Sequence, residues 1–221
     1  MPEASPEFVC QMERVLSVYQ RAYDPSHPVV CLDESPKQLI KEVRHPFVDS
    51  DGVQHVDYEY SREGVTDLYM IVEPLGGRRE VRVEDNHNRF TYARIVSHIA
   101  EHMYPEAEMI TLIEDNLSAH KLSALYEIFT PQRAQSIIER LEVVRTPTHG
   151  SCGSPPGLNI AECELSVLTR QGVSKRVADK QKLTGQVQAW YKIRNTKQTQ
   201  VNWQFTTKDA RIKLKHLYPS F

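Results

Sequence analysis

Two aspartates stand where carboxylates can take part in metal chemistry. Asp33 follows the apolar run Val29–Leu32, and Asp115 follows a second apolar run, Met109–Ile113. Such runs are typical of buried strands, and residues at their carboxyl ends lie at the edge of a sheet, where ligand crevices form. A carboxylate near a core costs free energy unless its charge is offset, and a divalent cation is the usual partner.

Glu162 is the third candidate carboxylate, and it lies in a segment with helical periodicity. Leu158, Ala161, Leu165 and Leu168 form an apolar stripe, so Glu162 projects beside the core toward the sheet edge. Glu164, two residues further, points elsewhere. Three acids suit Mg²⁺, and two such ions roughly 3.5–4 Å apart can activate a water or a 3′-hydroxyl and stabilise the leaving oxygen of a phosphodiester.

Each acid also has a structural interpretation. Asp33 and Asp115 could be turn or capping residues at the ends of strands, which is a common role for aspartate. Glu162 follows Asn159 by three positions, the spacing of a capping box. Spacing alone leaves both interpretations open.

The elements that must position these acids alternate in type along the chain. The pattern predicts an α/β fold, with three meander strands followed by alternating helices and strands in a mixed sheet that helices cover on both faces. A polar stretch follows Asp33 to about residue 52. Further along the chain, Ser118 is expected to cap the helix predicted over 119–129. The expected strands are 28–33, 55–60, 66–72, 79–84, 109–113 and 141–145, and the expected helices are 7–20, 90–104, 119–129, 131–140, 159–170, 179–194 and 206–215.

Composition is that of an ordinary globular protein. The 221 residues are 40% hydrophobic and 25% charged, which argues against wholesale disorder. No apolar run reaches the length of a membrane span, and the N-terminus does not resemble a signal peptide. The four cysteines form no CxxC pair, so neither a zinc site nor a disulfide framework is expected and a reducing cytosol fits.

Charge is distributed unevenly along the chain. Residues 1–169 contain 15 Lys and Arg against 27 Asp and Glu, whereas residues 170–221 contain 12 Lys and Arg and only two acids, Asp179 and Asp209. This basic tail could be a solvated helical face. It could equally bind a polyanionic partner, because acids are nearly absent from it.

Three blocks of sequence resemble the catalytic motifs of a known family. Val-Val-Cys-Leu-Asp33-Glu34, Ile-Glu-Asp115-Asn116-Leu-Ser-Ala-His120 and Leu-Asn-Ile-Ala-Glu162 are similar to those of bacterial insertion-sequence DDE transposases in the Tc/mariner-like superfamily. The stretch 201–215 resembles the C-terminus of that family, so the likeness covers nearly the whole chain.

The resemblance implies an RNase H-like fold and an enzyme that cleaves DNA strands and transfers them. It places two Mg²⁺ or Mn²⁺ ions on Asp33, Asp115 and Glu162, with Asn116 and His120 as supports near the site. The implied partners are double-stranded DNA, at transposon ends and target, and a second copy of the chain, in the cytoplasm of a bacterium and not at a membrane. The expected domains are a lead-in helix (1–27), the catalytic domain (28–172) and a basic helical extension (173–221).

Under this resemblance the basic tail contacts DNA phosphates without reading sequence, and its binding depends on salt. The residues assigned to this role are Lys175, Arg176, Lys180, Lys182, Lys192, Arg194 and Lys197.

Two features depart from the family pattern. The family normally has a DNA-binding helix-turn-helix region before the catalytic domain, whereas this chain begins just before that domain. The loop 151–157 is longer than expected and lacks the expected aromatic residue. The alternatives to an active transposase are therefore a truncated or decayed fragment that folds and binds DNA without catalysis, and a general RNase H-like nuclease.

Overall fold

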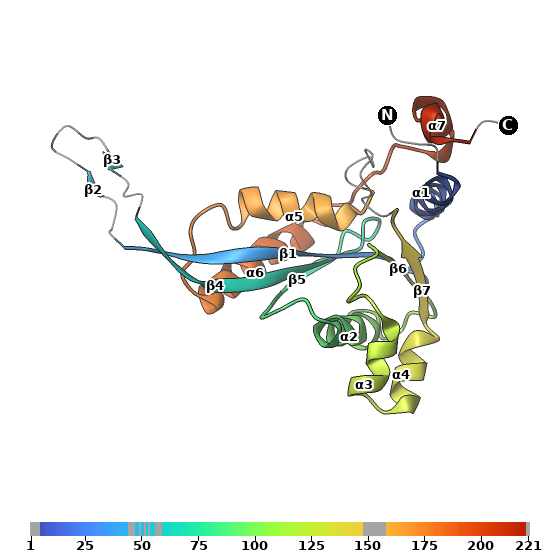
Figure 1. Cartoon of the computed structure of the whole chain (residues 1–221), viewed down its shortest axis with the longest axis horizontal. Helices are drawn as coiled ribbons and strands as arrows, with labels where there is room; N and C mark the ends of the chain where they lie inside the picture. The colour runs from blue at the N-terminus through green and yellow to red at the C-terminus, as the bar shows by residue number, and fades with distance from the viewer. Residues whose placement is uncertain are drawn as a thin grey trace.

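The computed structural model describes residues 5–43, 47–48, 50, 52, 54–55, 59–147 and 158–219. Within these residues, five strands form one mixed sheet in the order β5-β4-β1-β6-β7 (Figure 1). The strands of the sheet are β1 (Val29–Glu42), β4 (Tyr60–Val72), β5 (Arg79–Glu84), β6 (Ile110–Glu114) and β7 (Leu141–Arg145), and two short strands, β2 (Phe47–Val48) and β3 (Gln54–His55), pair apart from it.

The sheet combines an antiparallel meander with parallel strands, as the sequence predicts. β1 pairs with β4 and β4 with β5 in antiparallel fashion, whereas β6 runs parallel to β1 and β7 parallel to β6. Because β6 runs parallel to β1 and pairs with its first residues, and β7 runs parallel to β6, the carboxyl ends of β6 and β7 lie beside the part of β1 that contains Asp33.

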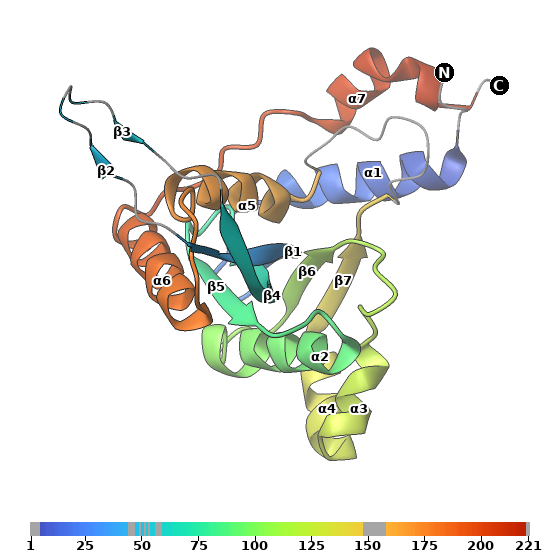
Figure 2. The same ribbon diagram turned by 60° about the vertical axis from the view of Figure 1, so that its left-hand side comes forward.

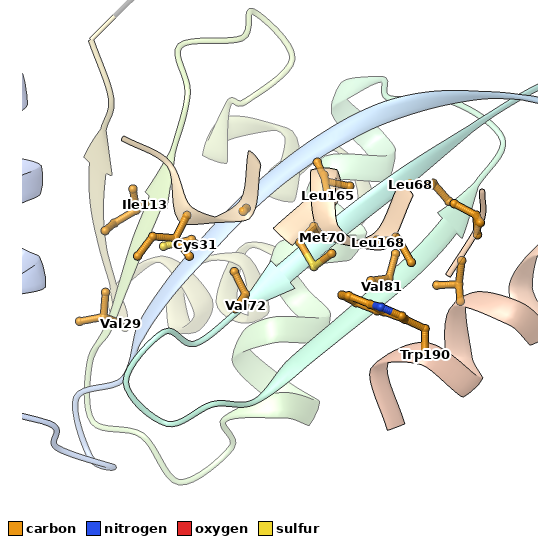
Figure 3. Packing of buried hydrophobic residues seen from close by; sticks show 14 of the residues in the cluster. Val29, Cys31, Leu68, Met70, Val72, Val81, Ile113, Leu165, Leu168 and Trp190 are labelled. Carbon is orange, nitrogen blue, oxygen red and sulfur yellow. The ribbon is translucent and has the colours of Figure 1, made fainter. Parts of the chain in front are cut away.

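Helices cover both faces of the sheet (Figure 2). Alternation along β1 sends Val29 and Cys31 into a core shared with α5 and α6, and Val30 and Leu32 into a second core shared with α2 and α3. Figure 3 shows side chains from β1, β4 and α5 meeting in the first of these cores. The helices and turns are α1 (Pro6–Tyr19), α2 (Arg89–His98), η1 (Ile99–Met103), η2 (Leu122–Ala124), α3 (Leu125–Ile128), α4 (Pro131–Ile138), α5 (Ile160–Gln171), α6 (Lys180–Thr196), α7 (Thr207–Lys213) and η3 (Lys215–Leu217).

β1 does not end at Asp33, so the strand predicted over 28–33 is too short, and the polar stretch that follows Asp33 begins as strand. The strand continues to Glu42 and pairs with β4 throughout, and together they form a long arm (Figure 1). Its outer residues are mostly half-exposed, although Leu39 is buried in the core shared with α5 and α6, so backbone pairing contributes much of what holds the arm together. The strand predicted over 55–60 lies largely outside the described residues.

The helix predicted over 119–129 is confirmed only over residues 122–128, and it begins later than predicted. Ser118 is exposed and caps nothing in the described residues; the chain turns at His120 and then forms only the short η2 and α3. The reason is local, because the Leu117 N–H donates to the Asp115 carboxylate at 2.9 Å and the His120 N–H donates to the Leu117 carbonyl. The backbone is thereby folded back toward the end of β6.

The two ends of the described chain pack against each other. Met12 and Leu16 of α1 share a small core with Ala210 of α7, and Arg211 makes two hydrogen bonds of 2.8 Å to Glu13. α1 also lies over the β7 edge of the sheet (Figure 2). None of the helices described is long and apolar enough to cross a membrane.

Candidate active site

The register of β1 and β6 places Asp33 and Asp115 at equivalent positions. The two strands are paired in parallel up to Cys31 and Ile113, and each aspartate lies two residues beyond that pair. Cys31 and Ile113 both point into the core shared with α5. Since side chains two residues apart share a face, Asp33 lies on the α5 side of the sheet.

Helix α5 is fixed to the sheet at its first turn, next to Glu162. Asn159 caps the helix by accepting the Ala161 N–H at 3.1 Å, and its side-chain amide donates to the Leu32 carbonyl at 2.8 Å. One buried side chain therefore starts the helix and ties it to β1 immediately before Asp33. The capping interpretation holds for Asn159, and it is compatible with a place for Glu162 at the site.

Tyr19 of α1 supports the same turn from the other side. Its buried hydroxyl donates to the Leu158 carbonyl at 2.8 Å and accepts the Ile160 N–H at 3.3 Å. The N-terminal helix thus helps to set where α5 begins.

Negative charge accumulates around Asp33. Burial, together with the charges of Glu34, Glu162 and Asp115, raises the pKa of Asp33 to about 7, although the Glu34 N–H donates to it at 2.9 Å. Glu162 and Asp115 are therefore near enough to act on Asp33 electrostatically. This surplus of carboxylate charge fits a divalent cation, which prefers oxygen ligands of this kind. Within the described residues, no three His, Cys, Asp or Glu side chains are already grouped around one metal position.

His120 is fully buried between two acids. Its Nδ1 lies 2.9 Å from Asp115 Oδ1, and its Nε2 lies 3.2 Å from Glu34 Oε2, while the ring stacks on Tyr92 at 4.7 Å. Burial alone lowers the pKa of His120, but contacts with Asp115 and Glu34 outweigh it and raise the pKa to about 10. A buried imidazolium therefore holds the Asp115 carboxylate from behind.

Asn116 acts on the backbone at the same sheet edge. Its side-chain amide donates to the Thr146 carbonyl at 2.8 Å, which joins the segment after β6 to the segment after β7. In this position it steadies the backbone next to Asp115.

Two further acids at the site, Glu34 and Glu114, are not among the residues that the sequence singles out. Glu34 contacts His120, and Glu114 is buried, where it accepts a 2.8 Å hydrogen bond from Tyr92. Burial raises the pKa of Glu114 to about 7. The sequence signal that could have identified them is their position next to a candidate aspartate. Alternation along the strand sends each of these acids to the opposite face of the sheet.

Glu164 points away from this site, as predicted, into a separate buried network. It contacts Arg79 of β5 at 3.0 Å and Arg194 of α6 at 2.9 Å, and neither its side chain nor that of Arg79 is more than 6% exposed. Arg194, which the sequence assigned to DNA, is thus engaged with the protein's own acid.

The other basic residues of the tail are distributed around α6 and the loop before it. Lys175, Lys192 and Lys197 are exposed, and the Arg176 guanidinium lies 5.1 Å from the centre of the Tyr60 ring. Lys180 pairs with Asp85 and Lys182 with Asp179. Helical spacing puts Lys180, Lys182 and Lys192 on different sides of α6, so they do not line a single face. Residues 148–157, which include the altered loop 151–157, lie outside the described residues.

Comparisons with known proteins agree with this architecture. Residues 28–184 match the family model described as DDE superfamily endonuclease. A comparison with curated protein sequences found no match.

Solved structures of a mariner transposase share the fold at low sequence identity. A Mos1 mariner paired end complex with Mn matches with a TM-score of 0.56 and 16% identity, over 98% of this chain and 63% of that one. A mariner Mos1 paired end complex with Mg gives 0.54 and 14% over 99% and 65%, and a pre-cleavage Mos1 transpososome gives 0.54 and 15% over 100% and 66%. The chain spans less than two thirds of the length of these proteins. The fold they share, a mixed sheet covered by helices, is RNase H-like. Because the family model covers most of the sequence, the chain belongs to the DDE superfamily of endonucleases.

Proposed function

We propose that this chain is the catalytic domain of an insertion-sequence transposase, which cleaves DNA strands with a divalent metal and joins the freed 3′-hydroxyl to target DNA. The observation that carries the proposal is that Asp33 on β1 and Asp115, directly after the adjacent parallel strand β6, lie at equivalent positions, and that the charges of Asp115 and Glu162 both act on Asp33. Membership of the endonuclease family and the likeness to transposase complexes with Mn and Mg support it.

In this proposal Asp33, Asp115 and Glu162 hold the metal, most simply as two ions. The ions supply a nucleophile activated at neutral pH and a counter-charge for the leaving 3′-oxygen of the phosphodiester. The chain's own residues position the ligands. His120 fixes the Asp115 carboxylate, Asn159 ties the Glu162 helix to β1, and Asn116 steadies the segment after β6.

The substrate in this proposal is double-stranded DNA, as transposon end and as target. The matched proteins are described as paired end complexes, so we also propose that two copies act together on DNA. A bacterial host, and association with its nucleoid, rest on the resemblance of the motif blocks. The exposed cations Lys175, Lys192 and Lys197 remain candidates for contacts with phosphates.

Nicking of supercoiled plasmid in Mn²⁺ or Mg²⁺ tests the catalytic proposal. We expect metal-dependent nicking by the wild-type chain and a loss of at least about 100-fold in Asp33→Asn, Asp115→Asn and Glu162→Gln. Glu127→Gln, on the surface of α3, is the matched control and should nick normally. Plasmid binding without nicking would instead identify a folded fragment without catalysis. If the chain only nicks DNA, and does so equally on DNA that lacks any transposon end, a general nuclease would be favoured.

A further inference from the structure

A pocket lies at the β7 edge of the sheet, where α1 packs. Its volume is about 420 Å³, and it is lined by residues of α1, η2 and β7. These residues are Gln11, Arg14, Leu122, Val143 and Arg145. β7 ends the strand order of the sheet, so the pocket opens at an edge that no other described strand covers.

The lining carries positive charge without an acid. Arg14 and Arg145 keep 58% and 43% of their side chains exposed. Their nearest acids are at the limit of pairing, because Arg14 is 3.8 Å from Glu142 and Arg145 is 3.7 Å from Glu114. The pair of Arg14 with Glu142 is weak and exposed, so the Arg14 guanidinium is available to an anion. Arg145 is held by the buried Glu114 and by the His120 carbonyl, and it adds positive charge to the lining.

The acid near Arg14 already has better partners. Glu142 accepts two hydrogen bonds from Arg21, at 2.9 and 3.2 Å, and one from Thr111 at 2.8 Å. Among the cations near Glu142, Arg14 is therefore the one that Glu142 neutralises least. Gln11 lies three residues before Arg14 on α1, so both side chains face the pocket from one side of the helix.

Arg145 connects the pocket to the candidate active site. Its guanidinium donates to the His120 carbonyl at 2.9 Å, and the His120 ring contacts Asp115 at 2.9 Å. Arg145 is also paired in register with Glu114, the residue before Asp115. An anion bound in the pocket would thus lie near the segment that follows β6, and the charges of Arg14 and Arg145 would offset its own.

We propose that this pocket binds a backbone phosphate of the DNA on which the site acts. Arginine suits the role because its planar guanidinium binds phosphate oxygens through two parallel hydrogen bonds. Gln11 adds an amide donor, and the apolar Leu122 and Val143 suit the face of a deoxyribose. The proposal rests on the proposed function, and it assigns a contact that holds the strand in position and reads no sequence.

Duplex binding measured by fluorescence anisotropy over a range of salt concentrations tests the pocket. We expect Arg14→Gln to weaken binding about tenfold and to reduce the slope of log K against log salt concentration by about 1. Arg14→Lys, which keeps the charge, should restore the slope. Arg89→Gln is the matched control, because Arg89 is similarly exposed but lies on α2 and pairs with Glu127.

The outcomes separate this inference from the proposed function. Arg14→Gln with unchanged Mn²⁺ affinity, and with binding weakened equally for any duplex sequence, supports the phosphate contact. Equal binding and equal slope for Arg14→Gln and Arg89→Gln would overturn it, even if the wild type nicks DNA. Failure to nick, with binding that still depends on Arg14, would overturn the catalytic proposal alone.

Discussion

Helix α5 carries two acids that meet opposite surroundings. Glu164 lies between the two cations Arg79 and Arg194 in a largely buried network, whereas Glu162 acts on the pKa of Asp33 in a region where carboxylates outnumber cations. The first arrangement is complete without any ligand. The second concentrates like charge at a sheet edge, which a protein tolerates where a bound cation offsets it. The contrast distinguishes an acid that stabilises the fold from one that serves a site.

Replacing Glu164 is expected to have the largest effect on the stability of the fold. Glu164→Ala leaves the fully buried Arg79 without its acid, and we expect the free energy of unfolding to fall by about 3–5 kcal/mol. Glu162→Ala, the matched change two residues earlier, should alter it by no more than about 0.5 kcal/mol. Urea unfolding of both variants measures this difference. Equal losses would remove the distinction between the two acids.

Asp33 should make the metal-free protein less stable as pH rises. Its pKa in the fold, about 7, exceeds its ordinary value of 3.8, so the folded state holds the proton more tightly and stability falls between these pH values. Asp33→Asn should remove a fall on the order of 2 kcal/mol from the urea-unfolding profile across that window.

Asp209 provides a control of opposite sign. Hydrogen bonds from Thr206 lower the pKa of Asp209, so its contribution is present above its ordinary value and is lost as pH falls. Asp209→Asn should therefore lower stability at neutral pH. A profile for Asp33→Asn that matches the wild type between pH 4 and 7 would contradict the crowding of charge around Asp33.

Replacing His120 should reduce metal binding at the candidate site and leave the fold elsewhere intact. Replacing the imidazolium in His120→Gln removes the group that holds Asp115, and we expect Mn²⁺ affinity to fall about tenfold in calorimetry. His98→Gln, which breaks a 2.9 Å contact between His98 of α2 and Glu80 of β5, is the control and should bind Mn²⁺ normally. An unchanged affinity in His120→Gln would show that Asp115 needs no such support.

The smallest effect is expected at Tyr19. Tyr19→Phe removes the hydroxyl that donates to the Leu158 carbonyl, at a cost of about 1 kcal/mol in urea unfolding. Tyr23→Phe, at an exposed tyrosine, should change nothing measurable. A Tyr19→Phe protein as stable as Tyr23→Phe would show that α1 does not fix the start of α5.

Much of the fold was predictable because its strands are apolar and its helices periodic. The strands over 79–84 and 141–145, and the helix that became α5, are confirmed nearly to the residue. The strand over 66–72 is confirmed as the inner half of β4, which begins six residues earlier, at Tyr60. The outer half of β1 was not predictable. Pro36, Lys37 and Gln38 show no strand pattern, and their conformation depends on pairing with β4, residues distant in sequence.

The site was predictable in its candidates but not in its surroundings. Apolar runs that are followed by an acidic residue indicate Asp33 and Asp115. Nothing in the local sequence indicates that His120 lies between Asp115 and Glu34, because Glu34 is 86 residues away from His120. The turn between Asp115 and His120, which the Leu117 and His120 N–H groups stabilise, delays the helix expected after Ser118. The two N-terminal contributors, Tyr19 and Arg14, act only through the packing of α1 on the sheet.

The most direct test of the account is Mn²⁺ binding by calorimetry to the wild-type chain and to Asp33→Ala, Glu162→Ala and Glu164→Gln. The account predicts that the wild type binds, that the first two substitutions weaken binding at least about tenfold, and that Glu164→Gln does not. No binding by the wild type, or a Glu162→Ala protein that binds as tightly as the wild type, would contradict it.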